Sequence, residues 1–291
     1  MSQSSTTPMS SSRPASRFGQ ALIDWVSDWG DLTLRGIDTT GDLALFSWSA
    51  LTWLFARRPR RGSLLPILYQ VGVMSLPVVA LTGMFIGMVL AVQSFFQFQQ
   101  LRLETRMGAV INLSLTRELG PVLAATMLAG RVGSAMAAEL GTMRVTEQID
   151  ALTSMGANPV QYLVVPRFLA FLLLIPALTV MAIFTGVVGG YFYSVIILGV
   201  DKHHYLYNTQ EFVSGFDLFA GVFKSWFFGV AIALVSCYHG FKCSAGAEGV
   251  GKAATSAFVH SFVLILALDL LLGISLDSVH YILRPEGSGL L

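Results

Sequence analysis

Residues 114–167 read SLTRELGPVLAATMLAGRVGSAMAAELGTMRVTEQIDALTSMGANPVQYLVVPR. In this stretch, two long apolar segments flank a short charged one at residues 144–156. A polar helix that lies between two membrane spans can serve as a binding site for a soluble partner. The stretch therefore favours a membrane protein that is driven by a separate soluble subunit.

The composition places most of the chain in a lipid bilayer. Of 291 residues, 54% are hydrophobic and 12% are charged, whereas soluble domains carry about 25% charged residues. The formal net charge of +1 gives no basis for nucleic-acid binding. The first 20 residues are rich in Ser, Thr and Pro and lack acidic residues. They favour a disordered cytosolic tail over a secretory signal, with an organellar transit peptide as an alternative.

Hydropathy predicts an all-α integral membrane fold with five transmembrane helices. We expect the spans at about residues 70–96, 108–141, 160–198, 218–241 and 254–276. The apolar segment at about 42–58 is too short to cross, and its tryptophans favour the headgroup level, so it is expected to be an interfacial helix. Residues 1–40 are expected to be a flexible cytoplasmic extension, 41–282 the membrane domain, and 283–291 an outer tail.

Lysine and arginine residues set the orientation of the spans. With the N-terminus inside, the inner segments carry Arg57, Arg58, Arg60, Arg61, Arg144, Arg167, Lys242 and Lys252. The outer segments carry only Arg102, Arg106, Lys202 and Arg284. The inner side is richer, so the N-terminus and residues 144–156 are expected in the cytoplasm and the C-terminus outside.

Four charges are predicted to lie in the outer half of the membrane. At 1.5 Å per residue, Arg117 and Glu118 lie about 14 Å deep, Lys224 lies about 9 Å deep, and Asp269 lies about 10 Å from the outer end of its span. Lipid tails cannot solvate such charges, so they need mutual pairing or a cavity. Two interpretations stay open: salt bridges between helices, or a polar pocket that meets a charged lipid headgroup.

Apolar walls for the acyl chains of a lipid could come from the outer end of the first span. The candidates there are Leu90, Phe95, Phe96, Phe98 and Leu101, although phenylalanine clusters are also typical of plain core. In the same span, Gly83 and Gly87 form a small-xxx-small pair, which indicates either close helix contact or simple tolerance of glycine. Arg131 and Glu139 are expected to brace the inner end of the second span.

The charged segment at 144–156 predicts a short helix. Thr146 is a plausible N-cap, with acidic Glu147 and Asp150 in the first turn. Ile149, Leu152 and Met155 recur at helical spacing, and Gly156 with Asn158-Pro159 ends the pattern. We interpret this helix as a docking element for a groove on a soluble partner, with a plain re-entry loop as the alternative.

Two patterns resemble binding motifs but lack what those motifs require. Gly246–Ala253 nearly spells a phosphate-binding loop, but its eighth position is Ala and a membrane span precedes it, so we expect a flexible cytoplasmic loop. Cys237 and Cys243 with His239 between them have the wrong spacing for zinc and are interpreted as small residues at a helix end. No motif of a nucleophilic or metal-dependent enzyme stands in the sequence.

The long run 115–167 resembles the signature of the MlaE/YrbE permease family, the membrane subunits of ABC transporters that work with MCE proteins in lipid traffic. GMFIGMVLAVQ at 83–93, FKSWFFG at 223–229 and HSFVLILALDLLL at 260–272 also match. The resemblance covers roughly residues 40–280. The Ser-rich N-terminal extension is longer than is typical of the family, and residues 98–101 differ from it.

The resemblance implies a multi-pass protein of the bacterial inner membrane that carries phospholipid and has no catalytic chemistry or cofactor of its own. The implied partners are a second copy of the chain, a cytoplasmic ATPase that binds ATP and Mg²⁺, a periplasmic MCE-domain protein and a small STAS-domain accessory subunit. A coupling helix at about 145–156 would dock the ATPase through Arg144, Glu147, Gln148, Asp150, Leu152 and Met155. The lipid-pocket positions would be Leu90, Arg117, Glu118, Lys224 and Asp269, joined by the wall residues Phe98 and Leu101.

Two other classes of function stay open at this point. One is an integral-membrane enzyme acting on lipids, which the lack of a nucleophile or metal constellation disfavours. The other is an ion-coupled secondary transporter that uses the charged cluster as a relay, which the lack of an obvious inverted repeat disfavours.

Overall fold

The computed structural model describes residues 17–56, 61–103 and 106–283, and every regular element in these ranges is a helix. The chain divides into two units, Met1–Leu45 and Phe46–Leu291. Helix α1 (Arg17–Ala56) forms the described part of the first unit and continues into the second. Residues 17–40, which belong to the expected flexible extension, are helical, and the flexibility of this extension stays a prediction. The Ser- and Pro-rich composition ends before Arg17, and no proline interrupts the chain from there to the end of α1.

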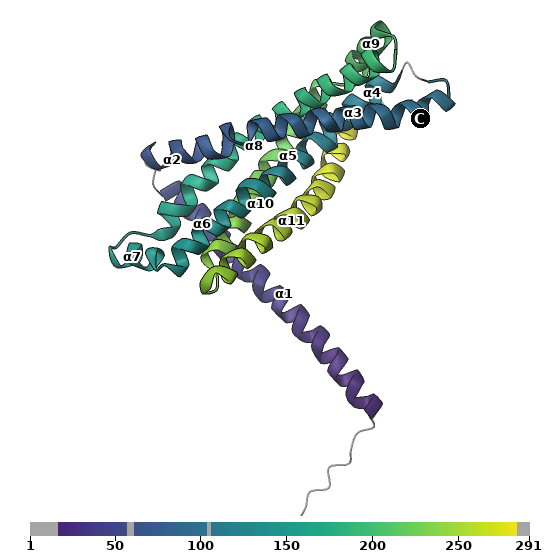
Figure 1. The fold of residues 1–291 in the computed structure, drawn as a ribbon. Coiled ribbons are helices and arrows are strands. Elements are labelled where there is room, and N and C mark those ends of the chain that lie inside the picture. Colours follow the sequence, from purple (N-terminus) through teal and green to yellow (C-terminus); the bar gives the residue numbers. More distant parts are fainter. Residues whose placement is uncertain (1–16, 57–60, 104–105, 284–291) are drawn as a thin grey trace, which may run out of the picture. The chain divides into compact units, whose positions relative to one another are not determined.

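The second unit contains five helical runs that are long and apolar enough to cross a membrane. They are Leu64–Gln100, Met107–Val145, Val160–Ile197, Gly215–Phe241 and Gly246–Val279. Each contains or closely matches one of the five predicted spans, so the predicted multi-pass helical fold is confirmed. Figure 1 shows the runs packed alongside one another as a bundle within this unit.

The first three runs are composite, because short π-helical segments interrupt the first two and flank the α-helix of the third. The first consists of α2 (Arg61–Leu68), the π-helical η1 (Tyr69–Val73) and α3 (Leu76–Gln100). The second consists of α4 (Met107–Ser114), η3 (Leu115–Leu119), α5 (Gly120–Leu128), η4 (Ala129–Gly133) and α6 (Ser134–Val145). The third consists of η5 (Val160–Val164), α8 (Val165–Tyr191) and η6 (Phe192–Ile197).

Proline explains two of these π-helical segments, η3 and η5. Pro121 and Pro166 each occupy the first turn of the α-helix that follows a π-helical segment. A proline cannot donate a backbone hydrogen bond and crowds the carbonyl one turn earlier, so the preceding turn widens. The backbone N–H of Gly120 accordingly reaches back five residues to the carbonyl of Leu115.

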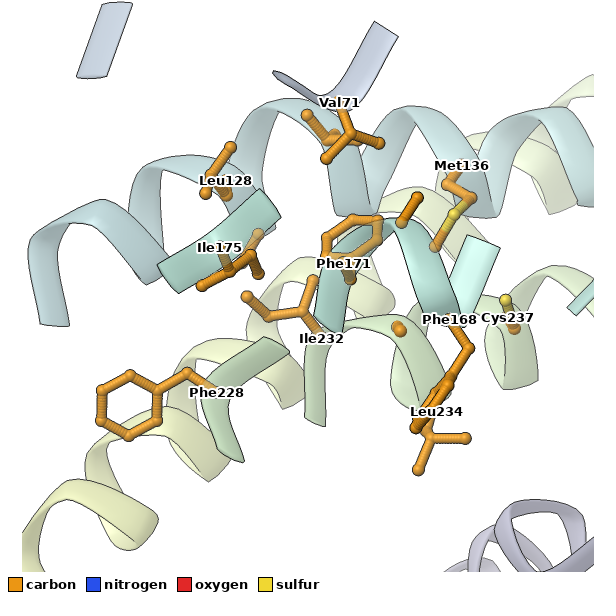
Figure 2. Packing of buried hydrophobic residues seen from close by; sticks show 14 of the residues in the cluster. Val71, Leu128, Met136, Phe168, Phe171, Ile175, Phe228, Ile232, Leu234 and Cys237 are labelled. Carbon is orange, nitrogen blue, oxygen red and sulfur yellow. The ribbon is translucent and has the colours of Figure 1, made fainter. Parts of the chain in front are cut away.

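The hydrophobic core of the second unit centres on α8 and α10 (Gly215–Phe241). Phe171 and Ile175 of α8 and Ile232 of α10 are completely buried, and Figure 2 shows them close together at the centre of the cluster. Because lipid is as apolar as these side chains, helix association in a membrane depends on close packing more than on expulsion of water.

Close packing is most evident where α3 lies alongside α8 (Figure 1). A Cβ atom added at Gly87 would overlap the backbone carbonyl of Gly186, and one added at Gly83 would lie 2.5 Å from the carbonyl oxygen of Ala182. The two glycines therefore allow the backbones to touch, which decides between the two interpretations of the small-xxx-small pair in favour of helix contact.

The end of α1 packs against the end of α10 within the second unit. The ring of Phe46 lies 6.0 Å from that of Tyr238 and 5.7 Å from that of Phe241. Trp48 is exposed, as a side chain at the headgroup level would be. The interfacial position of this helix stays a prediction, and residues 57–58 of the predicted segment lie outside the described residues, as does most of the predicted tail at 283–291.

Two stretches outside the predicted spans are helical, one between the third and fourth spans and the other at the predicted loop 246–253. The polar stretch after the third run contains α9 (Lys202–Phe212), whose N-cap Asp201 accepts a 2.9 Å hydrogen bond from the backbone N–H of His204. This bond holds the pKa of Asp201 below its usual value, because it stabilises the ionised form. The glycine-rich stretch from Gly246 forms the first turns of α11 (Gly246–Leu283), since packing of a long helix offsets the low helix propensity of its glycines.

Candidate functional site

Three of the four predicted membrane charges meet at Lys224 of α10. Its side chain is 3% exposed, and its Nζ lies 2.8 and 2.7 Å from the two carboxylate oxygens of Glu118 and 3.1 Å from Oδ1 of Asp269. Glu118 belongs to η3 and Asp269 to α11, so one ammonium group ties three spans together. An ammonium has three N–H donors, and these three contacts engage all of them.

Arg117, the fourth predicted charge, pairs with two carboxylates that were not anticipated. Its Nε lies 2.6 Å from Oδ1 of Asp217, and its Nη1 lies 3.3 Å from Oδ1 of Asp277. Asp217 is buried, and its Oδ2 also accepts hydrogen bonds from the backbone N–H and the hydroxyl of Ser214, at 2.7 and 2.9 Å. Asp217 thus caps the start of α10 and holds Arg117 at the same time.

Sequence reasoning missed these two aspartates for different reasons. Asp217 lay one residue before the predicted start of the fourth span, although Ser214-x-x-Asp217 is a variant of the capping-box pattern and could have been placed at a helix start. Asp277 lay just beyond the predicted end of the last span, although it follows Asp269 by eight residues and therefore shares its helix face. Both signals were present in the sequence.

The π-helical turn η3 explains how the adjacent residues Arg117 and Glu118 reach different partners. A π-helical turn holds one residue more than an α-helical turn, and such turns are frequent at functional sites. Arg117 is directed to α10 and the end of α11, and Glu118 is directed to Lys224. Pro121, two residues beyond the turn, is the local sequence feature that favours this geometry.

A pocket opens between these charged groups. Its lining residues come from η3, α10 and α11 and are Arg117, Glu118, Phe216, Ala220, Lys224, Gly273, Leu276 and Asp277. A Cβ atom at Gly273 would lie 3.4 Å from Nζ of Lys224, so a larger residue there would crowd the ammonium. We call this space the charged pocket.

The predicted apolar walls do not line the charged pocket. Leu90 and Phe98 are partly buried against a small cluster that includes Met107 and Leu115. Leu101 stands at the end of α3 and is exposed. A separate apolar pocket lies between α3, α5 and α8, and η3 contributes Leu115 and Leu119 to its lining.

The charged segment between the second and third runs contains a seven-residue helix, α7 (Gln148–Ser154), and not a plain re-entry loop. Thr146 is not its N-cap, because the Thr146 hydroxyl donates to the carbonyl of Thr142 and ends α6. The N-cap is Glu147, which adopts a left-handed conformation with φ of 59° and turns the chain between the two helices.

The apolar stripe expected on α7 faces the protein itself. Ile149 is buried, and Leu152 packs against the main core cluster. The exposed surface includes instead Arg144, Glu147, Gln148, Asp150 and Met155, and Met155 is 74% exposed. Arg144 and Asp150 form an ion pair of 2.5 Å across this surface. A partner would therefore meet a mainly polar surface with one protruding methionine.

Arg131 and Glu139 make contacts between helices, as bracing residues would. The Nη1 of Arg131 donates to the hydroxyl of Ser75, at 2.6 Å, next to the start of α3. Glu139 pairs at 2.9 Å with Arg167, a buried residue near the start of α8 that also bonds the carbonyl of Leu163. These contacts hold the first and third runs to the second.

The two patterns that resembled binding motifs have structural roles. The residues Gly246–Lys252 form helical turns, which lack the open loop that cradles a phosphate. Cys237 is buried in the main cluster, as the interpretation of a small apolar residue requires. Within the described ranges, no group of three or more His, Cys, Asp or Glu residues is placed to hold a metal ion.

Comparison with known proteins gives consistent matches. The protein-family model described as "Permease MlaE" matches residues 64–274. A "Probable ABC transporter permease protein" of Rickettsia felis is 41% identical over 251 residues, which cover 86% of this chain and 97% of the relative. The "Intermembrane phospholipid transport system permease protein MlaE" of Haemophilus influenzae is 34% identical over 252 residues, which cover 86% of this chain and 97% of the relative.

A plant protein also matches. It is "Protein TRIGALACTOSYLDIACYLGLYCEROL 1, chloroplastic" of Arabidopsis thaliana, which is 38% identical over 205 residues covering 70% of this chain and 59% of the relative. The family match spans the first four membrane runs and the fifth as far as Ile274, and it includes the charged pocket as far as Gly273. The chain therefore belongs to the MlaE permease family, as a non-catalytic multi-pass membrane subunit of an ABC transporter.

Proposed function

We propose that this chain moves phospholipid between the bacterial inner membrane and a periplasmic MCE-domain protein, with energy from a separate ATPase subunit. The observation that carries the proposal is the charged pocket, in which buried Lys224 is held by carboxylates from two other spans. Charges at membrane depth are costly and are typical of substrate pathways. The Haemophilus relative, which bears a phospholipid-transport name, agrees with a lipid as the substrate.

The orientation in this proposal follows from the excess of Lys and Arg in the inner segments. The N-terminus and α7 would then lie in the cytoplasm, while α9, the charged pocket and the C-terminus would lie toward the periplasm. Arg117 and the end of α6 at Val145 are separated by about 40 Å of helix. In Figure 1, α7 and α9 lie at opposite ends of the bundle, as this arrangement requires.

An ABC transporter permease works with an ATPase partner, and we infer that α7 is the docking element. It lies between the second and third spans, and its exposed surface carries Glu147, Gln148, Asp150 and Met155. ATP and Mg²⁺ would bind the partner, and this chain would hold no cofactor. Nucleotide binding by the ATPase would shift the permease from one arrangement of its helices to another. This shift would change the shape of the charged pocket, although the pocket is distant from α7.

The assembly in this proposal is a homodimer that holds the lipid in an outward-facing cavity between protomers. The MCE-domain protein would sit on the periplasmic side, and a small STAS-domain protein is a candidate accessory subunit. Leu90, Phe98 and Leu101 would contact the acyl chains at the outer end of α3, while the charged pocket would meet the headgroup. Family membership favours this assembly over a lipid-modifying enzyme or an ion-coupled transporter.

The proposal is tested by transfer of fluorescent phospholipid from proteoliposomes that contain the permease with its ATPase and MCE partners. We expect ATP-dependent transfer that is lost in Lys224→Met and kept in Lys252→Met, because Lys252 is an exposed residue at the start of α11. Equal transfer by the two variants would reject the charged pocket as the substrate site.

A further inference from the structure

The charge balance of the pocket distinguishes between lipid headgroups. Two cations are each held between two carboxylates: Lys224 between Glu118 and Asp269, and Arg117 between Asp217 and Asp277. With all six groups ionised, the cluster carries a formal charge of −2, and it stays negative if one carboxyl is protonated. Sequence reasoning gave a balanced set of charges, because it did not include Asp217 and Asp277.

The cations in this cluster are poorly placed to receive a free anionic group. The three donors of Lys224 are engaged by Glu118 and Asp269, and its side chain is 3% exposed. Arg117 is engaged from both sides by Asp217 and Asp277. At Lys224 a further negative charge would have to displace a carboxylate, and at either cation it would meet the repulsion of the surrounding carboxylates.

The carboxylates, by contrast, are accessible from the pocket. The side chains of Glu118 and Asp277 are 48% and 66% exposed, and both line the pocket. A positively charged group that enters the pocket would therefore find two acceptors without breaking an existing ion pair. Gly273 and Ala220 leave room beside them, since neither carries a large side chain.

We propose that the charged pocket recognises the ammonium group of a zwitterionic phospholipid and discriminates against anionic phospholipids. This inference rests on the proposed function, because it specifies which headgroup the same pocket accepts. A headgroup with a primary ammonium, as in phosphatidylethanolamine, would place that group between Glu118 and Asp277. A headgroup with a net negative charge, as in phosphatidylglycerol, would offer no cation to these carboxylates.

The test is a titration of the full-length chain in detergent with phosphatidylethanolamine and, separately, phosphatidylglycerol, followed by native mass spectrometry. We expect tighter binding of phosphatidylethanolamine by about three- to tenfold, the effect of roughly one unit charge at a partly solvated site. Asp277→Asn removes one exposed carboxylate and should reduce the preference. Glu211→Gln, which changes an exposed acidic residue on α9 outside the pocket, should leave the preference unchanged.

The outcomes separate this inference from the function on which it rests. Equal affinity for the two lipids, a preference for phosphatidylglycerol, or a preference that survives unchanged in Asp277→Asn would overturn the ammonium assignment and leave lipid binding intact. If Lys224→Met bound each lipid as tightly as the wild type does, the charged pocket would not be a lipid site, and both proposals would be rejected. Water-soluble glycerophosphoethanolamine should bind at least about tenfold more weakly than the lipid, since it has no acyl chains to bury, and equal affinity would overturn the assignment to a lipid.

Discussion

Lys224 and Glu118 lie 106 positions apart in the sequence, yet the Lys224 ammonium contacts both carboxylate oxygens of Glu118, at 2.8 and 2.7 Å. The contact joins the fourth membrane run to the second. It occurs in a π-helical turn that a proline favours, so the local backbone and the long-range ion pair are parts of one arrangement. A change to either residue should therefore affect both packing and the pocket.

Loss of the Lys224 ammonium should destabilise the membrane bundle. Lys224→Met leaves Glu118 and Asp269 without their shared cation, and removal of one partner of a buried ion pair costs about 3–5 kcal/mol. We expect about 3 kcal/mol, the low end of that range, because the Glu118 side chain is about half exposed. Thermal unfolding of the detergent-solubilised chain measures the effect. The double variant K224M/E118Q should recover much of the loss, and a double variant no more stable than Lys224→Met would contradict this account of the pair.

Asp217 should act as a positioning residue for Arg117. Asp217→Asn keeps an oxygen that can accept from Ser214 and so retains much of the cap on α10, but it removes the charge that holds Arg117. We expect lipid transfer to fall several-fold, with a smaller fall in unfolding temperature than in Asp217→Ala, because the cap is retained. Asp217→Ala should lower both, by about 1–2 kcal/mol in stability, because it also removes the cap. If both variants lost stability and transfer in parallel, Asp217 would have only a structural role.

Gly87 should tolerate no larger residue. Gly87→Ala places a methyl group against the backbone carbonyl of Gly186, so α3 and α8 must separate and lose their close packing. The matched control is Gly251→Ala on α11, where the new methyl group meets nothing within 4 Å and should stabilise the helix by up to about 1 kcal/mol. Unfolding temperatures of the two variants should therefore shift in opposite directions, and equal shifts would argue against backbone contact between α3 and α8.

The exposed surface of α7 should govern binding of the ATPase. Glu147→Lys reverses a charge on that surface, and we expect a several-fold reduction in the amount of ATPase that co-purifies with the permease. Glu248→Lys makes the same change on an exposed position in the first turn of α11 and serves as the control. Undiminished co-purification with Glu147→Lys would show that the partner docks elsewhere.

Much of the fold could be predicted from the sequence, because hydropathy over about 20 residues is a strong local signal in a membrane protein. All five spans followed from it, whereas the helix within 145–156 followed from helical spacing and its end signals. The depth argument also identified Arg117, Glu118, Lys224 and Asp269 as charges that need partners, since a charge in lipid has few alternatives to pairing.

The remaining features depend on the directions in which side chains point, which depth and helical spacing do not determine. Arg117 was grouped with Lys224 by depth alone, but depth does not fix the direction of a side chain, and the π-helical turn directs it to Asp217 and Asp277. Helical spacing on α7 predicted an apolar stripe correctly, but it could not tell whether Ile149 and Leu152 face a partner or the protein's own core. Because the chain supplies that core itself, the polar side of α7 is the surface left for the proposed partner.

The most direct test of the account is ATP-dependent phospholipid transfer measured on two preparations in parallel, the purified permease alone and the permease with its ATPase and MCE partners. The account assigns energy input to the partner at α7 and substrate to the charged pocket. It predicts no nucleotide hydrolysis and no uphill transfer by the permease alone. It predicts ATP-dependent transfer by the complex, which Glu147→Lys reduces several-fold and Lys224→Met abolishes. ATP hydrolysis or uphill transfer by the permease alone would contradict it.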